Sequence, residues 1–102
     1  MRRTETAEVW VARDDGNEIV RAVAIVGVGI DESGTVTARL GYSQGATVIL
    51  ADPGKHNGAY PPDDFHRKLI SAIAQLSDAS GAFQLRPVHD EARGWQWITE
   101  PL

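Results

Sequence analysis

Residues 63–76 read DDFHRKLISAIAQL, and this stretch has a clear helical pattern. Its apolar residues Phe65, Leu69, Ile73 and Leu76 recur at helical spacing, so they line one face of a helix while polar side chains fill the other. The two aspartates that open the stretch can cap free N–H groups and lie at the positive end of the helix dipole. We therefore predict one amphipathic helix that packs on the rest of the domain through this face.

Upstream of the helix, four segments have the composition and the alternation of β-strands. They are residues 8–13, 18–30, 35–40 and 46–51. Short turns rich in Asp, Gly and Asn separate them, and connections this short favour an antiparallel meander. In the longest segment, Gly27 and Gly29 predict a bulge or a bend.

Two further strands, 83–86 and 95–99, follow the helix, and Pro87 is expected to end the first of them. The prediction is a single α+β domain over residues 1–102. It consists of a four-stranded antiparallel meander, one packed helix and a C-terminal β-hairpin that completes the sheet. A lone helix covers one sheet face. Val23 and Ile25 on the other face then need cover, either from a rolled, barrel-like sheet or from a dimer.

Composition restricts the function classes. The chain has 102 residues, of which 42% are hydrophobic and 24% charged, as in an ordinary globular domain. It has no cysteine, which excludes disulfides, thiolate zinc sites and cysteine nucleophiles. We expect no cofactor, no metal site and no catalytic residues, because no known catalytic or ligand motif is present. The net charge of −4 and the scattered basic residues disfavour nucleic-acid binding.

The sequence has neither a signal-peptide core nor a membrane-spanning segment, so we expect a cytoplasmic protein.

One candidate ligand site lies in the long loop over residues 52–62, which contains His56 and Tyr60. His89, beside two acidic residues in a predicted turn, is a second histidine that could join it. A histidine next to a carboxylate can serve as a general base. The competing interpretation is that both histidines belong to polar loops.

A second candidate surface involves Trp95 and Trp97, which alternation places on one strand face about 7 Å apart. They either cover the core or anchor a partner, because tryptophan is enriched in binding hot spots. Together with Val23 and Ile25 they define the predicted partner-binding residues.

The leading hypothesis is a non-enzymatic protein-interaction module, such as a small accessory, adaptor or inhibitor protein. It would act through a sheet edge or an aromatic surface on a protein partner or a second copy of the chain. The alternative is a small enzyme or ligand-binding domain that uses the 52–62 loop with a histidine–carboxylate pair.

Overall fold

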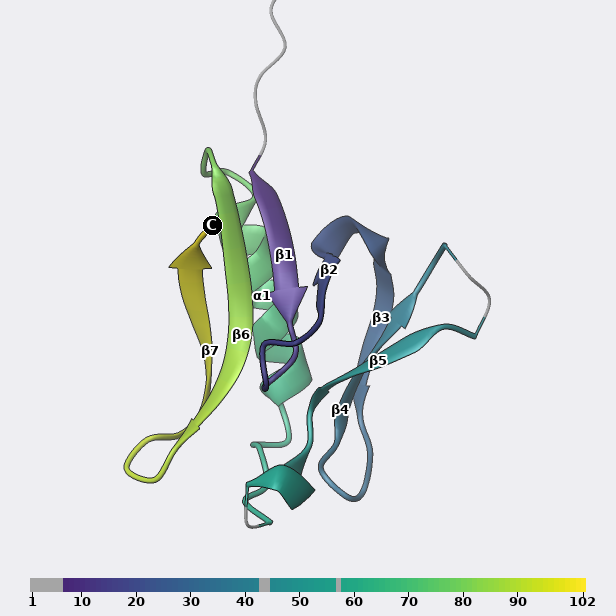
Figure 1. The fold of residues 1–102 in the computed structure, drawn as a ribbon, viewed down its shortest axis with the longest axis vertical. Helices are drawn as coiled ribbons and strands as arrows, with labels where there is room; N and C mark the ends of the chain where they lie inside the picture. Colours follow the sequence, from purple (N-terminus) through teal and green to yellow (C-terminus); the bar gives the residue numbers. More distant parts are fainter. Residues whose placement is uncertain (1–6, 43–44, 57) are drawn as a thin grey trace, which may run out of the picture.

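The computed structural model describes residues 7–42, 45–56 and 58–102. This part of the chain contains strands in two sheets, one α-helix, α1, and two short 3-10 helices, η1 and η2 (Figure 1). In chain order the elements are β1 Glu8–Ala12, β2 Ile19–Arg21, η1 Ala22–Ala24, β3 Ile25–Ile30, β4 Val36–Leu40, β5 Thr47–Ala51, η2 Pro53–Lys55, α1 Phe65–Leu76, β6 Ala82–Asp90 and β7 Gly94–Pro101. The predicted α+β class is confirmed.

The strands divide into a mixed sheet and an antiparallel sheet. The first sheet has the order β2-β1-β6-β7, in which β1 is antiparallel to β2 but parallel to β6. The second sheet is the meander β3-β4-β5. The meander therefore has three strands instead of the four expected, and the C-terminal hairpin completes the other sheet by pairing with β1. Among the described residues neither sheet closes into a barrel. Strands β1 and β6 are far apart in the sequence. The rule that short connections join antiparallel neighbours gives no information about a parallel pairing between such distant strands.

The predicted long strand over residues 18–30 is split between the two sheets. Helix η1 carries the chain from one sheet to the other, and the N–H of Gly41 donates to the carbonyl of Ala24 at 2.8 Å where the second sheet begins. The register of β3 against β4 then shifts, which turns Val26 outward. The predicted bulge is confirmed, and the Arg39 guanidinium occupies the space that a side chain at Gly27 would need.

This break separates the two residues that alternation had placed on one face. Val23 lies on η1 and is 83% exposed. Ile25 begins β3 and packs against the core. A 3-10 turn does not preserve the two-residue period of a strand, so the two side chains do not form a common surface.

Strand β6 continues through Pro87 to Asp90, four residues beyond its predicted end. Residues of an antiparallel pair alternate between hydrogen-bonded and non-hydrogen-bonded positions. The N–H of Leu102 donates to the carbonyl of Ala82, which makes the even-numbered residues of β6 the ones that bond to β7. Pro87 is odd-numbered and therefore needs no N–H toward β7. On its other side the ladder with β1 ends at Leu85, before Pro87 is reached.

Helix α1 lies against both sheets and holds them together. It contacts β6 and β7 of the first sheet and β3 of the second. Phe65 and Leu69 are fully buried, and Ile73 and Leu76 pack at the margin of the core, as the apolar spacing predicted. The strands contribute the rest of the core, including Val11, Val36, Leu50 and Leu85. In the part of the chain described here, no helix has the length and apolar character needed to cross a membrane.

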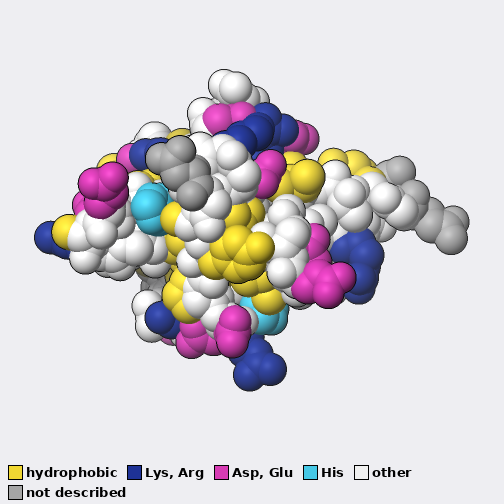
Figure 2. Space-filling view, turned by 90° about the horizontal axis from the view of Figure 1, so that it is seen from below, with side chains coloured by type: hydrophobic (Ala, Val, Ile, Leu, Met, Phe, Trp, Pro, Cys, Tyr) yellow, Lys and Arg dark blue, Asp and Glu magenta, His cyan; other side chains and the backbone are white. Residues whose placement is uncertain are grey.

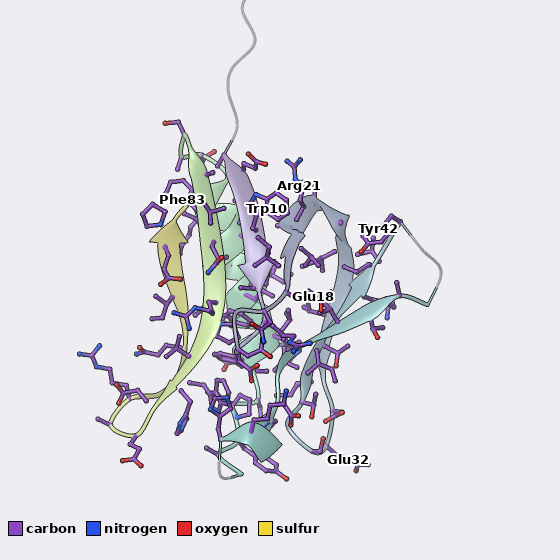
Figure 3. The ribbon with its side chains drawn as sticks, in the orientation of Figure 1. Trp10, Glu18, Arg21, Glu32, Tyr42 and Phe83 are labelled. Atoms are coloured by element: carbon purple, nitrogen blue, oxygen red, sulfur yellow. The ribbon has the colours of Figure 1, made fainter. Side chains whose placement is uncertain are left out.

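The outer face of the first sheet carries the third tryptophan. Trp10 on β1 and Arg21 on β2 are register partners, and their side chains lie together (Figure 3). The Arg21 guanidinium carbon is 5.5 Å from the centroid of the Trp10 ring, which is a cation–π distance. Arg21 also pairs with Glu8 at 3.9 Å. Trp10 is thus engaged on its own sheet face, away from the C-terminal tryptophans.

Candidate functional site

The two C-terminal tryptophans face α1 from β7, on the same side of the strand, as alternation predicted. Trp97 stacks on Phe65, with ring centroids 4.7 Å apart, and its Nε1 donates to the Phe65 carbonyl at 2.8 Å. Trp95 is only 6% exposed, meets Phe65 edge-on, and donates through Nε1 to the carbonyl of Ala59 at 2.8 Å. Both rings therefore belong to the packing of α1 on the sheet. Neither stands free on the surface as a separate aromatic anchor.

A groove of about 600 Å³ runs between α1 and β7 beside these rings. Phe65, Ala72 and Trp97 contribute its apolar lining. Polar residues also line it, with Ser71 and Gln75 coming from α1 and Gln96 from β7. The groove therefore combines an aromatic floor with polar margins.

Strand β7 is the edge of its sheet on this side. Its even-numbered residues bond to β6, so the backbone N–H and C=O groups of Trp95, Trp97 and Thr99 point to the open side. No strand in the described part of the chain pairs with them. Pro101, which lacks an N–H, ends this row of free groups. The outer edge of β7 is therefore an open hydrogen-bonding template alongside the groove.

Two basic side chains line the groove near the end where both elements begin. Lys68 lies in the first turn of α1, and Arg93 immediately precedes β7. Both elements start at the lower end of the view in Figure 1. Figure 2 shows this end of the molecule, where hydrophobic side chains are framed by charged ones. Both residues are exposed, and in the described residues neither forms an ion pair.

The predicted loop site brings His56 and His89 together, with ring centroids 6.0 Å apart and Trp95 in contact with both. The carboxylate that contacts His56 is Asp14, from the turn after β1. Its Oδ2 lies 3.1 Å from His56 Nε2 and accepts the N–H of Asp52 at 3.1 Å. The Asp14 side chain is 4% exposed. This pair joins residues 42 positions apart, and no local sequence signal marks it.

The acidic residues adjacent to the histidines have local roles instead. Asp52 accepts the N–H of Gly54 and caps η2. Asp90 accepts the N–H groups of Ala92 and Arg93 in the β6–β7 turn, and these bonds lower the pKa of its carboxyl group. Tyr60 is 63% exposed and lies over Gly34, where it lines a different hollow. The structure therefore assembles two of the three predicted loop-site residues and leaves the third apart. In the described residues, no three histidine or acidic side chains gather as a metal ion would require.

The sequence interpretation did not identify Lys68, Arg93 and the free backbone of Thr99 as site residues. The period of α1 places Lys68, Ala72 and Gln75 along one side of the helix, which is a usable signal. The sequence does not show that this side of the helix borders β7.

Comparison of the chain with known protein families, with curated proteins and with solved structures gave no match.

Proposed function

We propose that the protein is a non-enzymatic interaction module that binds an extended segment of a partner protein as an added strand on β7. In this recognition mode, main-chain hydrogen bonds supply affinity, and pockets for alternate side chains supply specificity. The observation that carries the proposal is the open edge of β7 running beside the groove. Trp95, Trp97 and Thr99 provide the free N–H and C=O groups on that edge.

The groove supports the proposal because of the geometry of an added strand. Side chains of a strand alternate between the two faces of the sheet. Every second side chain of a bound segment would point toward α1, over Phe65 and Trp97. The polar α1 side chains Ser71 and Gln75 would flank them. The stacked ring pair is held by the hydrogen bond from Trp97 to Phe65, so the floor is already ordered before binding, which limits the entropic cost of association.

The other edge of the sheet is less suited to this role. Strand β2 at that edge has three residues, whereas β7 has eight. In the second sheet, part of the β5 edge is occupied, because the N–H of Asp14 donates to the carbonyl of Leu50 at 2.8 Å. Long open edges are uncommon in soluble proteins unless something blocks or uses them. The open length of β7 therefore favours use by a partner.

The test is peptide binding by a variant whose edge is blocked. Thr99→Pro removes the outward N–H of Thr99 without removing a bond to β6, and Thr99→Ala is the matched control that keeps the N–H. The probe is a displayed library of random nine-residue peptides, with selected members then measured by fluorescence polarisation. We expect wild type and Thr99→Ala to bind the selected peptides and Thr99→Pro to lose at least about tenfold in affinity, the effect of about 1.4 kcal/mol. Circular dichroism and the melting temperature check that both variants fold.

Backbone amide NMR gives the second readout. On peptide addition, the amides of Trp95, Trp97 and Thr99 should shift and gain protection from exchange. The inward amides of the same strand, such as Gln96, should change less. Peptides that bind Thr99→Pro as tightly as wild type, or a library that yields no binder, would show that the proposal is wrong.

A second copy of the chain could use the same edge, since two β7 strands can pair about a twofold axis. Sedimentation equilibrium separates this outcome from a heterologous partner. A dimer that Thr99→Pro dissociates and Thr99→Ala preserves would identify the chain itself as the partner.

A second candidate function, a small enzyme or ligand-binding domain, is favoured by the Asp14–His56 contact. A buried carboxylate that holds a partly exposed imidazole is an arrangement suited to a general base. The probes are the chromogenic esters p-nitrophenyl acetate and bis-p-nitrophenyl phosphate. Hydrolysis that disappears in folded His56→Gln and Asp14→Asn variants, and persists in His66→Gln, would support this candidate. We rank it second, because the same bonds already serve to tie the 52–62 loop to the end of β1.

A further inference from the structure

We infer that the end of the groove formed by Lys68 and Arg93 binds a carboxylate of the added strand. This inference rests on the proposed function, because it names the chemistry of the segment that β7 would bind. Lys68 projects from α1, and Arg93 lies at the base of β7, so the two cations belong to different walls of one groove. A group bound between them would contact both walls.

Charge complementarity singles out an anion. The chain carries fourteen acidic and ten basic residues, so an average surface groove would be lined by more acids than bases. In the described part of the chain, the groove is lined by two cations, Lys68 and Arg93, and by no carboxylate. Neither cation is paired with an acidic side chain among the described residues. The carboxylate of Asp90 accepts the N–H groups of Ala92 and Arg93 and also interacts with the Arg93 charge, but it does not line the groove.

A carboxylate suits these partners better than a neutral group. The planar Arg93 guanidinium can bind both carboxylate oxygens, and Lys68 adds a point charge from the opposite wall. The carboxylate can come from an Asp or Glu side chain or from the C-terminus of the bound peptide. A C-terminal carboxylate at the beginning of β7 would require the peptide to run antiparallel to β7.

The test uses nine-residue peptides arrayed in four sets. The sets have neutral or Asp/Glu-containing sequences, each with a free or an amidated C-terminus. We expect binders to require a carboxylate from at least one source. Binding by free but not by amidated neutral peptides identifies the C-terminal source, and binding by amidated acidic peptides identifies the side-chain source. Each result supports the inference.

Charge-removing variants locate the carboxylate. Lys68→Gln and Arg93→Gln should each weaken binding of carboxylate peptides about fivefold, the upper range for an exposed charge pair. Lys55→Gln is the matched control, because Lys55 is an exposed lysine on η2 and does not line the groove. Raising the salt concentration to about 1 M, where the Debye length falls to about 3 Å, should reduce wild-type affinity and erase the difference between variants.

The outcomes separate this inference from the proposed function. If neutral amidated peptides bind as well as acidic ones, and the Lys68 and Arg93 variants bind like wild type, the carboxylate inference is wrong. Loss of binding in Thr99→Pro would still support strand addition in that case. If Thr99→Pro binds normally while Lys68→Gln and Arg93→Gln do not, the carboxylate site stands, and strand addition is wrong.

Discussion

The Nε1 of Trp97 donates a hydrogen bond to the carbonyl oxygen of Phe65 at 2.8 Å, and the two rings stack with centroids 4.7 Å apart. Trp97 of β7 is thus joined to the first residue of α1 both by a hydrogen bond and by ring stacking. This contact fixes α1 against β7 beside the groove that both residues line. Trp97 therefore lines the groove and at the same time packs against Phe65 of the core.

Removing the indole N–H should have a smaller effect than removing the ring. Trp97→Phe keeps an aromatic ring against Phe65 and loses one hydrogen bond, so we expect a loss of about 0.5–1.5 kcal/mol in the free energy of unfolding. Trp97→Ala also loses the stack and the apolar contact, and should cost about 3 kcal/mol or more. Urea denaturation followed by circular dichroism measures both values. Equal stability of Trp97→Ala and wild type would contradict the observed packing.

The buried face of α1 can be tested with two neighbouring residues. Leu69 is fully buried, so Leu69→Ala should cost about 2–5 kcal/mol through lost contacts and the cavity left behind. Ile70, which is 51% exposed on the same helix, is the control, and Ile70→Ala should change stability by less than about 1 kcal/mol. Chemical denaturation should therefore separate the two variants clearly. Similar losses at both positions would mean that the helix is rotated from its observed orientation.

The buried carboxylate of Asp14 should contribute more to stability than an exposed one. Asp14→Ala leaves the N–H of Asp52 and the ring nitrogen of His56 without their acceptor, at an expected cost of about 1–3 kcal/mol. Glu32→Ala, in an exposed turn, should change stability by no more than about 0.5 kcal/mol. Thermal unfolding of both variants provides the comparison. A neutral effect at Asp14 would argue that these bonds do not anchor the loop.

The turn after β1 gives a prediction about pH. The side-chain hydrogen bond from Arg13, and then the N–H of Asn17, lower the pKa of Asp15 from 3.8 to about 2. Because the folded-state pKa is depressed, the stabilising contribution of this group is present above about pH 3.8 and is lost as the pH falls toward 2. Carboxyl NMR titration should find the low pKa in wild type and a value closer to 3.8 in Arg13→Gln. An unchanged pKa in that variant would exclude Arg13 as its main cause.

Alanine substitutions at two glycines with positive φ should separate the cost of backbone strain from the cost of a steric clash. Gly16 has φ of 75° with open space around it, and Gly34 has φ of 83°. A Cβ at Gly34 would come within 3.0 Å of the Pro53 side chain and 3.1 Å of the Tyr60 ring. Gly16→Ala should therefore cost about 1–2 kcal/mol from the left-handed conformation alone. Gly34→Ala should cost more and should displace Tyr60, which Tyr60 fluorescence or aromatic NMR shifts can detect.

Local patterns in the sequence were enough to predict much of the secondary structure. The 3.6-residue period from Phe65 to Leu76 predicts α1, and alternation predicts the strands on either side of it. The bulge in β3 lies between Ile25 and Gly27, next to the first of the two glycines that predicted it. These features depend on residues close together in the chain, where a few side-chain periods and turn preferences dominate the free energy.

Which distant segments meet was decided only in the tertiary structure. The pairing of Val9 with Phe83, the Asp14–His56 contact and the groove between α1 and β7 each join parts of the chain separated by at least one other element. Such contacts depend on which arrangement buries the apolar faces of all the elements together. No single segment of the sequence contains that information. Trp95 and Trp97 illustrate the difference. Their alternation on one strand face follows from the sequence, but whether that face meets a helix or solvent depends on where α1 packs.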